Sequence, residues 1–223
     1  MKWHVNLGMG AENYRFHDHE KLAHYANAAT DIEFNFPFGI KEHEGIHSRT
    51  DFDLGNHQKF SGKKIQYFDP ETNENYTPYV VETSIGVARM VLAVLSHSFK
   101  EETLENGEKR VVMSIPAPIA PVKAAVLPLV KKDGLPELAQ TIMDDLKYDF
   151  KCQYEEKDSI GKRYRRQDAI GTPFCITVDH ESLKDQCVTL RDRDTMQQER
   201  VPIEKLRSII DEKVNMNNLL RKL

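Results

Sequence analysis

Apolar and polar positions recur with clear periods in the second half of the chain. The run "VKAAVLPL" is continuously apolar, as in a buried strand, and apolar residues from Leu135 to Leu146 then recur at helical spacing. The expected elements, in order, are a strand at 122–129, a helix at 135–146, a strand at 150–154, a basic helix within 159–171, strands at 173–178 and 187–190, and a helix opened by Pro202. This order predicts an α/β domain with a mixed sheet.

The first half has a different pattern. Alternating residues predict strands at 30–36, 41–47 and 76–82, and a helix with a broad apolar face begins near Gly86. These elements indicate an antiparallel sheet with one long helix against it. Residues 1–26 carry no cap or strand pattern that starts a fold, so we expect this half to be truncated.

A charged stretch, "KEETLENGEKR", separates the two halves. It has one glycine and no apolar periodicity, which is typical of a linker. A chain of 223 residues is long enough to bury a sizeable core on either side of it. We therefore expect one domain at 1–99, a linker at 100–110 and a second domain at 111–223.

Composition limits the possibilities without naming a function. With 39% hydrophobic residues, 30% charged residues and a net charge of −4, any nucleic-acid contact must come from local basic patches. The N-terminus lacks the apolar core of a signal peptide, and no apolar run reaches the roughly 18–20 residues of a membrane span. Three scattered cysteines argue against a disulfide scaffold or a cysteine zinc site. We expect a cytoplasmic protein that is not bound to a membrane.

One short motif matches the H-E-x-x-H pattern of zinc hydrolases, namely "HEGIH" (His43, Glu44, Gly45, Ile46, His47). That chemistry needs both histidines on one face of a helix, with the glutamate as base on a zinc-bound water. Gly45 disfavours a helix here, and residues four apart on a strand lie roughly 13 Å from each other, too far for one zinc ion. A zinc hydrolase is thus a remote alternative, and we expect no metal at these residues.

An acid and an arginine lie at the junction between the third predicted strand and the long helix. Arg89 projects from the first helical turn, where a positive charge opposes the helix dipole and favours a neighbouring anion such as a phosphate. Gly86 allows a ligand to approach the backbone closely. Glu82 can pair with Arg89 or accept a cationic ligand, and the residues alone leave both possibilities open.

Basic residues gather in "GKRYRRQD", with four positive charges around Tyr164, and recur at Arg191 and Arg193. Positive charge next to an aromatic ring suits single-stranded RNA, whose bases stack on such rings. A solvated helix face and a charged turn are the alternative interpretation.

These residues form part of a series of motifs that recurs in one enzyme family. The motifs follow in the order "HEKLAHYANAATDIEF", "GIHSRTDFDL", "HQKFSGKKIQYFDP", "YVVETSIGVAR", "APIAPVKAAVLPL", "SIGKRYRRQDAIGTPFCITVD" and "TLRDRDTM". The chain resembles the C-terminal part of the dimeric glycyl-tRNA synthetases, which are class II aminoacyl-tRNA synthetases. The resemblance implies that residues 1–99 end a class II catalytic domain, an antiparallel sheet with flanking helices. It implies that residues 111–223 form an α/β anticodon-binding domain with a mixed sheet.

The resemblance also assigns site residues by position. "VETSIGVAR" matches the third class II signature motif, so Glu82 and Arg89 are expected to be catalytic. The glycine site is expected to contain Glu82, Thr83, Ser84, Ile85 and Gly86, with Glu82 and Ser84 on the ammonium group. The ATP site is expected to contain Glu42, His43, Gly86, Val87, Ala88 and Arg89, with Arg89 on the phosphates. His43, Thr83 and Ala88 depart from the residues common in the family.

Glycine anticodons end in two cytosines, whose amino groups suit carboxylate acceptors. We expect the anticodon site to be lined by Glu156, Asp158, Arg163, Arg191 and Arg193.

The resemblance further implies ligands and partners. The full enzyme attaches glycine to its tRNA through glycyl-adenylate, uses ATP with Mg²⁺ as counter-ion and no zinc, and is a homodimer. The first two class II motifs, including the arginine that grips the α-phosphate, have no match in this sequence. The chain alone is therefore expected to be close to inactive. A non-catalytic RNA-binding paralogue is the alternative.

Overall fold

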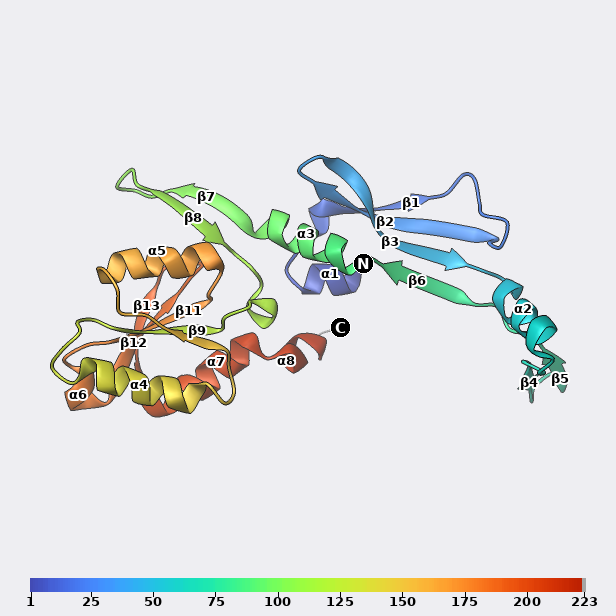
Figure 1. Ribbon diagram of the computed structural model, residues 1–223. Helices are drawn as coiled ribbons and strands as arrows, with labels where there is room; N and C mark the ends of the chain where they lie inside the picture. Colours follow the sequence, from blue (N-terminus) through green and yellow to red (C-terminus); the bar gives the residue numbers. More distant parts are fainter. Residues whose placement is uncertain (222–223) are drawn as a thin grey trace. The chain divides into compact units, whose positions relative to one another are not determined.

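The computed structural model describes residues 1–221, and the chain divides into two compact units (Figure 1). Unit 1 contains residues 9–96, and unit 2 contains the described residues from His97 onward. The first eight residues are divided between the two. Each unit is built around a sheet of its own.

Unit 1 is built on an antiparallel sheet. In chain order the elements up to residue 98 are α1 (Lys2–Asn6), η1 (Ala11–Asn13), β1 (Tyr14–Asp18), β2 (Ala28–Phe36), β3 (Gly39–Ser48), α2 (Phe52–Ser61), β4 (Tyr67–Asp69), β5 (Glu74–Tyr76), β6 (Val81–Ile85) and α3 (Val87–Ser98). The sheet has the strand order β1-β2-β3-β6, and β4 pairs with β5 in a separate hairpin. The predicted antiparallel sheet followed by a long helix is confirmed.

Residues 1–26, which we expected to contain no strand, include both α1 and β1, so that prediction is wrong. β1 leaves no pattern in the sequence because only Tyr14 is buried and its other four residues are exposed. The strand is held by its antiparallel pairing with β2, from Tyr14 opposite Phe34 to Asp18 opposite Thr30. An exposed edge strand of this kind is commonly polar.

One face of the unit 1 sheet is aromatic and buried. Ile32, Phe34 and Phe36 alternate along β2 and are each at most 3% exposed. The ring of Phe34 lies 5.0 Å from that of Tyr14 and 4.9 Å from that of Phe36, measured between centroids. The residues between them on β2 point to the opposite, polar face.

Unit 2 contains the predicted α/β domain. From residue 99 the elements are β7 (Phe99–Thr103), β8 (Lys109–Met113), η2 (Ala117–Ile119), β9 (Ala124–Pro128), α4 (Leu135–Leu146), β10 (Cys152–Tyr154), α5 (Ile160–Ile170), β11 (Phe174–Val178), α6 (Ser182–Asp185), β12 (Cys187–Asp192), β13 (Gln198–Pro202), η3 (Ile203–Lys205), α7 (Leu206–Val214) and α8 (Met216–Leu220). The main sheet has the order β10-β9-β11-β12-β13. Its first three strands are parallel and the remaining pairs antiparallel.

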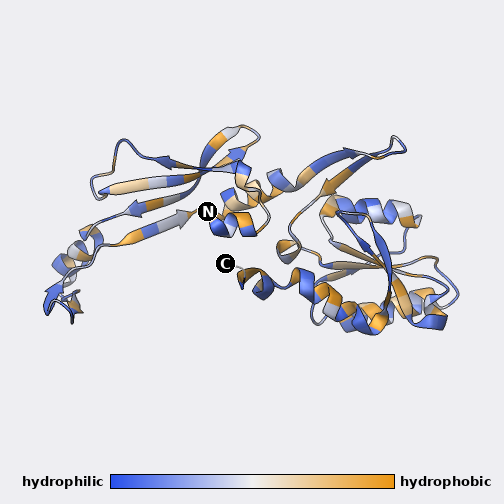
Figure 2. Ribbon diagram, turned by 180° about the vertical axis from the view of Figure 1, so that it is seen from behind, coloured by the Kyte–Doolittle hydropathy of each residue, from blue (hydrophilic) through white to orange (hydrophobic). Residues whose placement is uncertain are grey.

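Helices cover both faces of this sheet. Leu135 and Ile142 of α4 and Leu206 of α7 join the strands in one buried cluster. On the other face, Tyr164 of α5 packs against Leu127 of β9. Figure 2 shows hydrophobic and hydrophilic residues alternating along α4 and α7, as expected for helices with one buried side. Unit 2 is therefore a sheet between two helical layers.

Two segments that we expected to be irregular are strands. The charged stretch at 100–110 forms most of the β7–β8 hairpin, in which Phe99 lies opposite Met113. The segment before Pro202 contains β13, which pairs with β12 at the edge of the sheet. β7 and β13 keep most of their charged and polar side chains in solvent, so apolar periodicity does not mark them.

Among the described residues, no helix is long and apolar enough to cross a membrane.

Candidate functional site

Glu82 and Arg89, which the sequence left open as an ion pair, are held by different partners. Arg49 Nη1 donates to Glu82 Oε2 at 2.6 Å, and Arg49 Nε donates to Asp53 Oδ2 at 2.6 Å. The Arg49 guanidinium also lies 4.1 Å from the centroid of the Tyr25 ring. The hydrogen bond that Arg49 donates to Asp53 is the main reason that the pKa of Arg49 is raised above its usual value. The ion pair between Glu82 and Arg89, one of the two possibilities that the sequence left open, is not formed, and Glu82 pairs with Arg49 instead.

Glu82 and Ser84 share one face of β6 because side chains alternate along a strand. On β3, His47 lies opposite Glu82 and Gly45 lies opposite Ser84. A Cβ atom at Gly45 would lie 3.1 Å from His47 Cε1 and 3.5 Å from Asp31 Oδ1. Because Gly45 has no side chain, it leaves open space between Asp31 of β2, His47 of β3 and Ser84 of β6.

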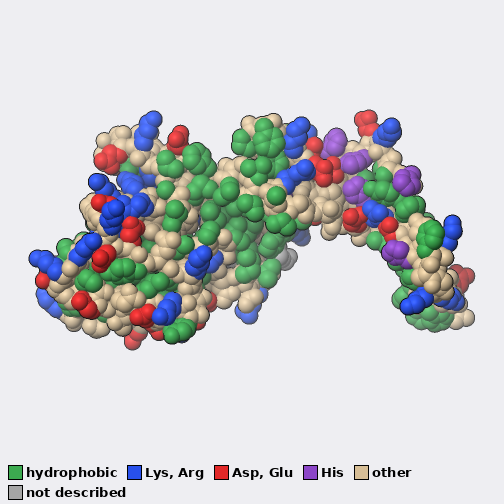
Figure 3. All heavy atoms as spheres, viewed as in Figure 1, with side chains coloured by type: hydrophobic (Ala, Val, Ile, Leu, Met, Phe, Trp, Pro, Cys, Tyr) green, Lys and Arg blue, Asp and Glu red, His purple; other side chains and the backbone are tan. Residues whose placement is uncertain are grey.

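Histidines gather over this part of unit 1, as Figure 3 shows. His19 Nε2 lies 2.8 Å from Asp31 Oδ2, and the rings of His19 and His47 meet edge to face with centroids 5.8 Å apart. The ring of His17 lies 6.1 Å from that of His19. The sequence analysis missed these histidines as a group because they come from separate segments with no common motif.

Arg89 lines a cleft of about 500 Å³ whose lining does not include Glu82 or Ser84. The lining residues are Phe36, Phe38, Lys41, Glu42, Ala88, Arg89 and Leu92. Arg89 Nη1 donates to the carbonyl oxygen of Glu42 at 2.6 Å and lies 3.6 Å from the Glu42 carboxylate. The cleft therefore brings together Glu42, Ala88 and Arg89 from the expected ATP residues.

Four residues of this cleft, Phe36, Phe38, Lys41 and Leu92, add to the predicted set. Phe36 and Phe38 are stacked, with ring centroids 5.1 Å apart and an angle of 6° between the planes. Lys41 supplies a second positive charge beside Arg89. Gly86 and Val87, also expected at the ATP site, are exposed where α3 begins.

His43 is buried, in contrast to the other expected ATP residues. The pairing of β2 with β3 shifts at this point, which leaves His43 as the extra residue of a bulge between Glu42 and Glu44. Its ring lies 4.9 Å from that of His4 and 5.8 Å from that of Phe34. Burial lowers the pKa of His43 to about 4, so the ring is neutral at pH 7.

The zinc-hydrolase alternative fails on the geometry of β3. "HEGIH" lies within this strand, so the helical face that the zinc chemistry requires is not formed. Within residues 1–221, no group of three or more histidine, cysteine or acidic side chains could hold a metal ion.

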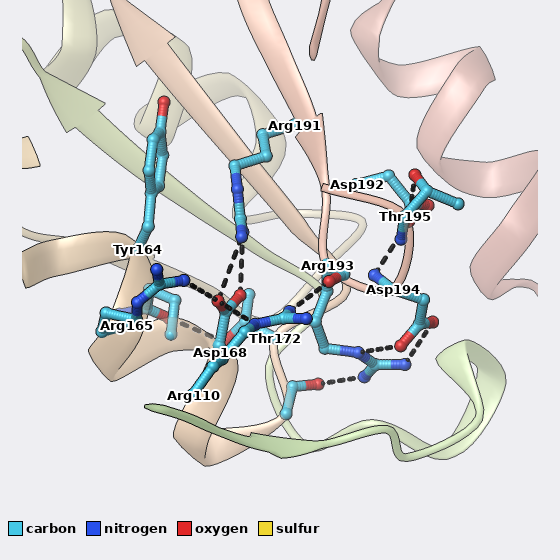
Figure 4. A network of polar contacts seen from close by, with 12 residues as sticks. Arg110, Tyr164, Arg165, Asp168, Thr172, Arg191, Asp192, Arg193, Asp194 and Thr195 are labelled. Atoms are coloured by element: carbon cyan, nitrogen blue, oxygen red, sulfur yellow. Dashed lines mark hydrogen bonds and ion pairs between the residues drawn. The ribbon is translucent and has the colours of Figure 1, made fainter. Parts of the chain in front are cut away.

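A buried ion network lies beside α5 in unit 2 (Figure 4). Asp168, which is fully buried, accepts hydrogen bonds from Arg191 at 2.8 and 3.0 Å and from Arg110 Nε at 2.9 Å. The Arg191 guanidinium lies 4.7 Å from the centroid of the Tyr164 ring. Arg191, expected at the anticodon site, is thus occupied by Asp168, and its side chain is only 4% exposed.

Arg193 and Arg163 are also bound inside the domain. Arg193 donates to the carbonyl oxygen of Gly171 at 2.8 Å and to both carboxylate oxygens of Asp194. Arg163 Nη1 donates to the carbonyl oxygens of Pro128 at 2.7 Å and Glu155 at 3.2 Å. Both arginines are 2% exposed, so their guanidinium groups brace the backbone.

Glu156 and Asp158 lie nearer the surface, each with a side chain 38% exposed. The hydroxyl of Tyr154 donates to Glu156 Oε2 at 2.7 Å, and this bond is the main reason that the pKa of Glu156 is lowered. Asp158 accepts a hydrogen bond from Arg166 Nη1 at 3.0 Å. Both carboxylates are therefore within reach of a ligand.

A cleft of about 430 Å³ opens beside Arg191. Its lining combines cations, an aromatic ring, an amide and a carboxylate, and consists of Glu108, Gly161, Lys162, Tyr164, Arg165, Arg191, Met196 and Gln198. Glu108 and Gln198 were missed because they lie in segments that the sequence analysis took for a linker and a charged turn.

Sequence comparisons connect these two units to known proteins. Residues 123–213 match the family model described as "Anticodon binding domain". The glycine–tRNA ligase of Chlorobaculum tepidum is 55% identical to 92% of this chain, which covers 43% of that protein. Those of Macrococcus caseolyticus and Borrelia hermsii are 53% and 51% identical over 96% and 92% of this chain, covering 46% and 47% of those proteins. The chain therefore spans less than half the length of these relatives.

Structural comparisons show the fold. The RNA binding domain of threonyl-tRNA synthetase from Cryptosporidium parvum matches 84% of this chain and 43% of its own, with a TM-score of 0.63 at 20% identity. Prolyl-tRNA synthetase from the same organism matches 99% of this chain and 44% of its own, with a TM-score of 0.64 at 16% identity. The predicted fold class is confirmed.

Proposed function

Because nearly the whole chain is similar to glycine–tRNA ligases, we propose that it corresponds to their C-terminal part and serves in the ATP-dependent attachment of glycine to its tRNA. The observation that carries the proposal is an identity of 51–55% to three such enzymes, combined with the anticodon-binding match. Residues 1–99 carry one part of the glycine and ATP site. Residues 100–110 connect it to an anticodon-binding domain at 111–223.

Glu82 and Ser84 form the glycine end of this site. They share a face of β6. Arg49 donates a hydrogen bond to one oxygen of the Glu82 carboxylate at 2.6 Å, which fixes the orientation of that carboxylate. A fixed carboxylate next to a hydroxyl suits a small ammonium group. Thr83 and Ile85 point to the other face of β6, and Gly86 ends the strand.

Arg89 forms the phosphate end. With Lys41 it gives the 500 Å³ cleft two positive charges, which suit the phosphates of ATP, and the stacked Phe36 and Phe38 offer an aromatic wall. The exposed start of α3 adds backbone N–H groups for an anion. Mg²⁺ supplies further neutralisation of the phosphates when it enters with ATP, and Glu42 is the carboxylate nearest to Arg89 in this cleft.

The reaction of the whole enzyme has two steps. The glycine carboxylate attacks the α-phosphate of ATP, which gives glycyl-adenylate and releases pyrophosphate, and the 3′ end of the tRNA then takes the glycyl group. The residues of this chain bind and orient the two small substrates, and positioning of this kind supplies much of the catalysis. We place this enzyme in the cytoplasm as a homodimer.

In unit 2, Glu156 and Asp158 accept hydrogen bonds from the cytosine amino groups of the anticodon. Arg163 supports them indirectly, because it donates to the carbonyl oxygen of Glu155, directly before Glu156. Arg191 and Arg193 hold the neighbouring strand end in place through Asp168 and Gly171. This proposal is supported by the exposure of the two carboxylates and by the burial of the three arginines.

Binding of tRNA tests the proposal. The affinity for a glycine tRNA transcript is measured by fluorescence anisotropy and compared with that for a transcript whose two anticodon cytosines are uridines. Glu156→Gln should lower the preference for cytosine by about 1–3 kcal/mol. Asp145→Asn, an equal charge change at an exposed carboxylate of α4, should leave that preference intact. Equal binding of both transcripts by the unaltered chain would refute anticodon recognition.

A further inference from the structure

His47, the second histidine of "HEGIH", lies beside the glycine end of the proposed site and has no role in it so far. It is paired with Glu82 across β3 and β6, so the two side chains stand next to each other on one face of the sheet. Ser84 lies on the same face, two residues after Glu82. The imidazole of His47 therefore borders the place where the ammonium group of an amino acid would bind.

The His47 ring leans over Gly45. A Cβ atom added at Gly45 would lie 3.1 Å from Cε1 and 3.5 Å from Nδ1 of this ring, so the ring reaches van der Waals contact with that position. Gly45 lies opposite Ser84 in the pairing of β3 with β6. The ring thus closes one side of the open space above Gly45, beside the hydroxyl of Ser84.

Neighbouring rings hold His47 in this position. The ring of His19 meets it edge to face, at 90° and with centroids 5.8 Å apart, and the ring of Tyr25 lies 6.5 Å away. His19 is itself fixed, because its Nε2 atom lies 2.8 Å from Asp31 Oδ2. Tyr25 is covered by the guanidinium group of Arg49, 4.1 Å from its centroid. A ring held by such neighbours keeps its place when a ligand enters.

We infer that His47 limits the size of the amino acid that this site accepts. An ammonium group bound by Glu82 and Ser84 brings the α-carbon to within one covalent bond, about 1.5 Å, of its nitrogen. A hydrogen atom on this carbon fits beside the His47 ring, whereas a methyl group in the same place would collide with it. The inference rests on the proposed function for the position of glycine, and on the contacts of His47 for the size limit.

The test measures how well the full chain distinguishes glycine from alanine. The probes are nonhydrolysable sulfamoyl analogues of glycyl-adenylate and L-alanyl-adenylate, which have groups for both the glycine end and the phosphate end. Isothermal titration calorimetry gives their dissociation constants for the unaltered chain, His47→Ala and His47→Phe. His180→Ala is the control, because it removes the imidazole of an exposed histidine that belongs to unit 2.

The unaltered chain and His180→Ala should bind the alanyl analogue at least about tenfold more weakly than the glycyl analogue. His47→Ala should bring the two dissociation constants to within about threefold of each other and leave the glycyl value nearly unchanged, because it removes only the obstacle to the methyl group. His47→Phe keeps a ring of similar shape without the ring nitrogens, so it should retain the discrimination.

Three results would overturn the inference. They are continued rejection of the alanyl analogue by His47→Ala, loss of glycyl binding in that variant, and equal or absent binding of both analogues by the unaltered chain. Far-UV circular dichroism checks that the variants are folded, and His47→Ser repeats the test if His47→Ala is not. The preference for glycine tRNA, measured on the same samples, tests the proposed function separately, so a chain that keeps this preference while His47→Ala rejects alanine loses the inference alone.

Discussion

The two units differ in how completely they bury their own surfaces. In unit 2, helices cover both faces of the sheet, and even charged groups such as Asp168 and Arg193 lie inside with bound partners. In unit 1, one helix shows an apolar side to solvent and the sheet ends in an open edge. Within the residues that the structure describes, unit 2 therefore buries more of its apolar surface than unit 1 does.

The largest effect is expected at the buried ion network of unit 2. Asp168→Ala leaves Arg110 and Arg191 without their shared carboxylate in the interior. Loss of one partner of a buried ion pair costs about 3–5 kcal/mol. Asp145→Ala, at an exposed ion pair with Arg207, should change stability by less than about 1 kcal/mol. Chemical denaturation followed by far-UV circular dichroism measures both, and equal effects would show that the network is not buried as described.

Truncation of leucines compares the helices of the two units. Leu206 on α7 is 1% exposed, so Leu206→Ala should destabilise unit 2 by about 2–5 kcal/mol. Leu95, on the exposed apolar side of α3, is 42% exposed, so Leu95→Ala should cost less than about 1 kcal/mol. Thermal unfolding measures the two variants. A large cost at Leu95 would mean that this side of α3 is covered.

The buried histidine predicts a pH dependence confined to unit 1. The pKa of His43 falls from 6.5 to about 4 because of burial, so the unfolded chain binds a proton that the folded chain rejects. Stability is therefore lost as the pH falls from about 6.5 towards 4, by up to about 3 kcal/mol, and is unaffected above that range. The fluorescence of Trp3, the only tryptophan, reports unfolding of unit 1.

His43→Phe is the control for this pH dependence. The phenyl ring fits among the neighbouring aromatic rings and cannot take up a proton. The variant should lose the His43 contribution between pH 6.5 and 4 and retain the pH dependence of the other groups. Identical pH profiles for the variant and the unaltered chain would contradict the burial of His43.

Two helix-terminating glycines give the smallest expected difference. Gly171 ends α5 at φ 86°, and an added Cβ would lie 3.0 Å from the carbonyl oxygen of Met113. Gly62 ends α2 at φ 68°, with nothing within 4 Å of such a Cβ. Gly62→Ala should cost about 1 kcal/mol from backbone strain alone, and Gly171→Ala about 2 kcal/mol or more because of the added clash. Equal losses of stability for the two variants on thermal unfolding would contradict a clash between the added Cβ of residue 171 and Met113.

Periodicity predicted the elements whose own residues form the core. The helix at 135–146 and the buried strand before it have that property, and α4 and β9 lie where the pattern places them. β1, β7 and β13 were missed because their stability comes from pairing with a neighbour, while most of their side chains stay in solvent.

The candidate site was predicted less completely, because charge patterns do not show which partner a side chain takes. Glu82 is bound by Arg49, which is 33 residues away in the chain, and not by nearby Arg89. Arg163 occurs in a basic cluster like a solvated helix face, yet its partners are backbone carbonyls of β9 and Glu155. Such contacts depend on the tertiary fold and leave no local signal.

Hydrogen exchange across the whole chain tests the contrast between the units most directly. In the free chain, the amides of β11 at the centre of the unit 2 sheet should exchange slowly, and those of β6 at the open edge of the unit 1 sheet should exchange much faster. Exchange in β6 as slow as in β11 would contradict the account.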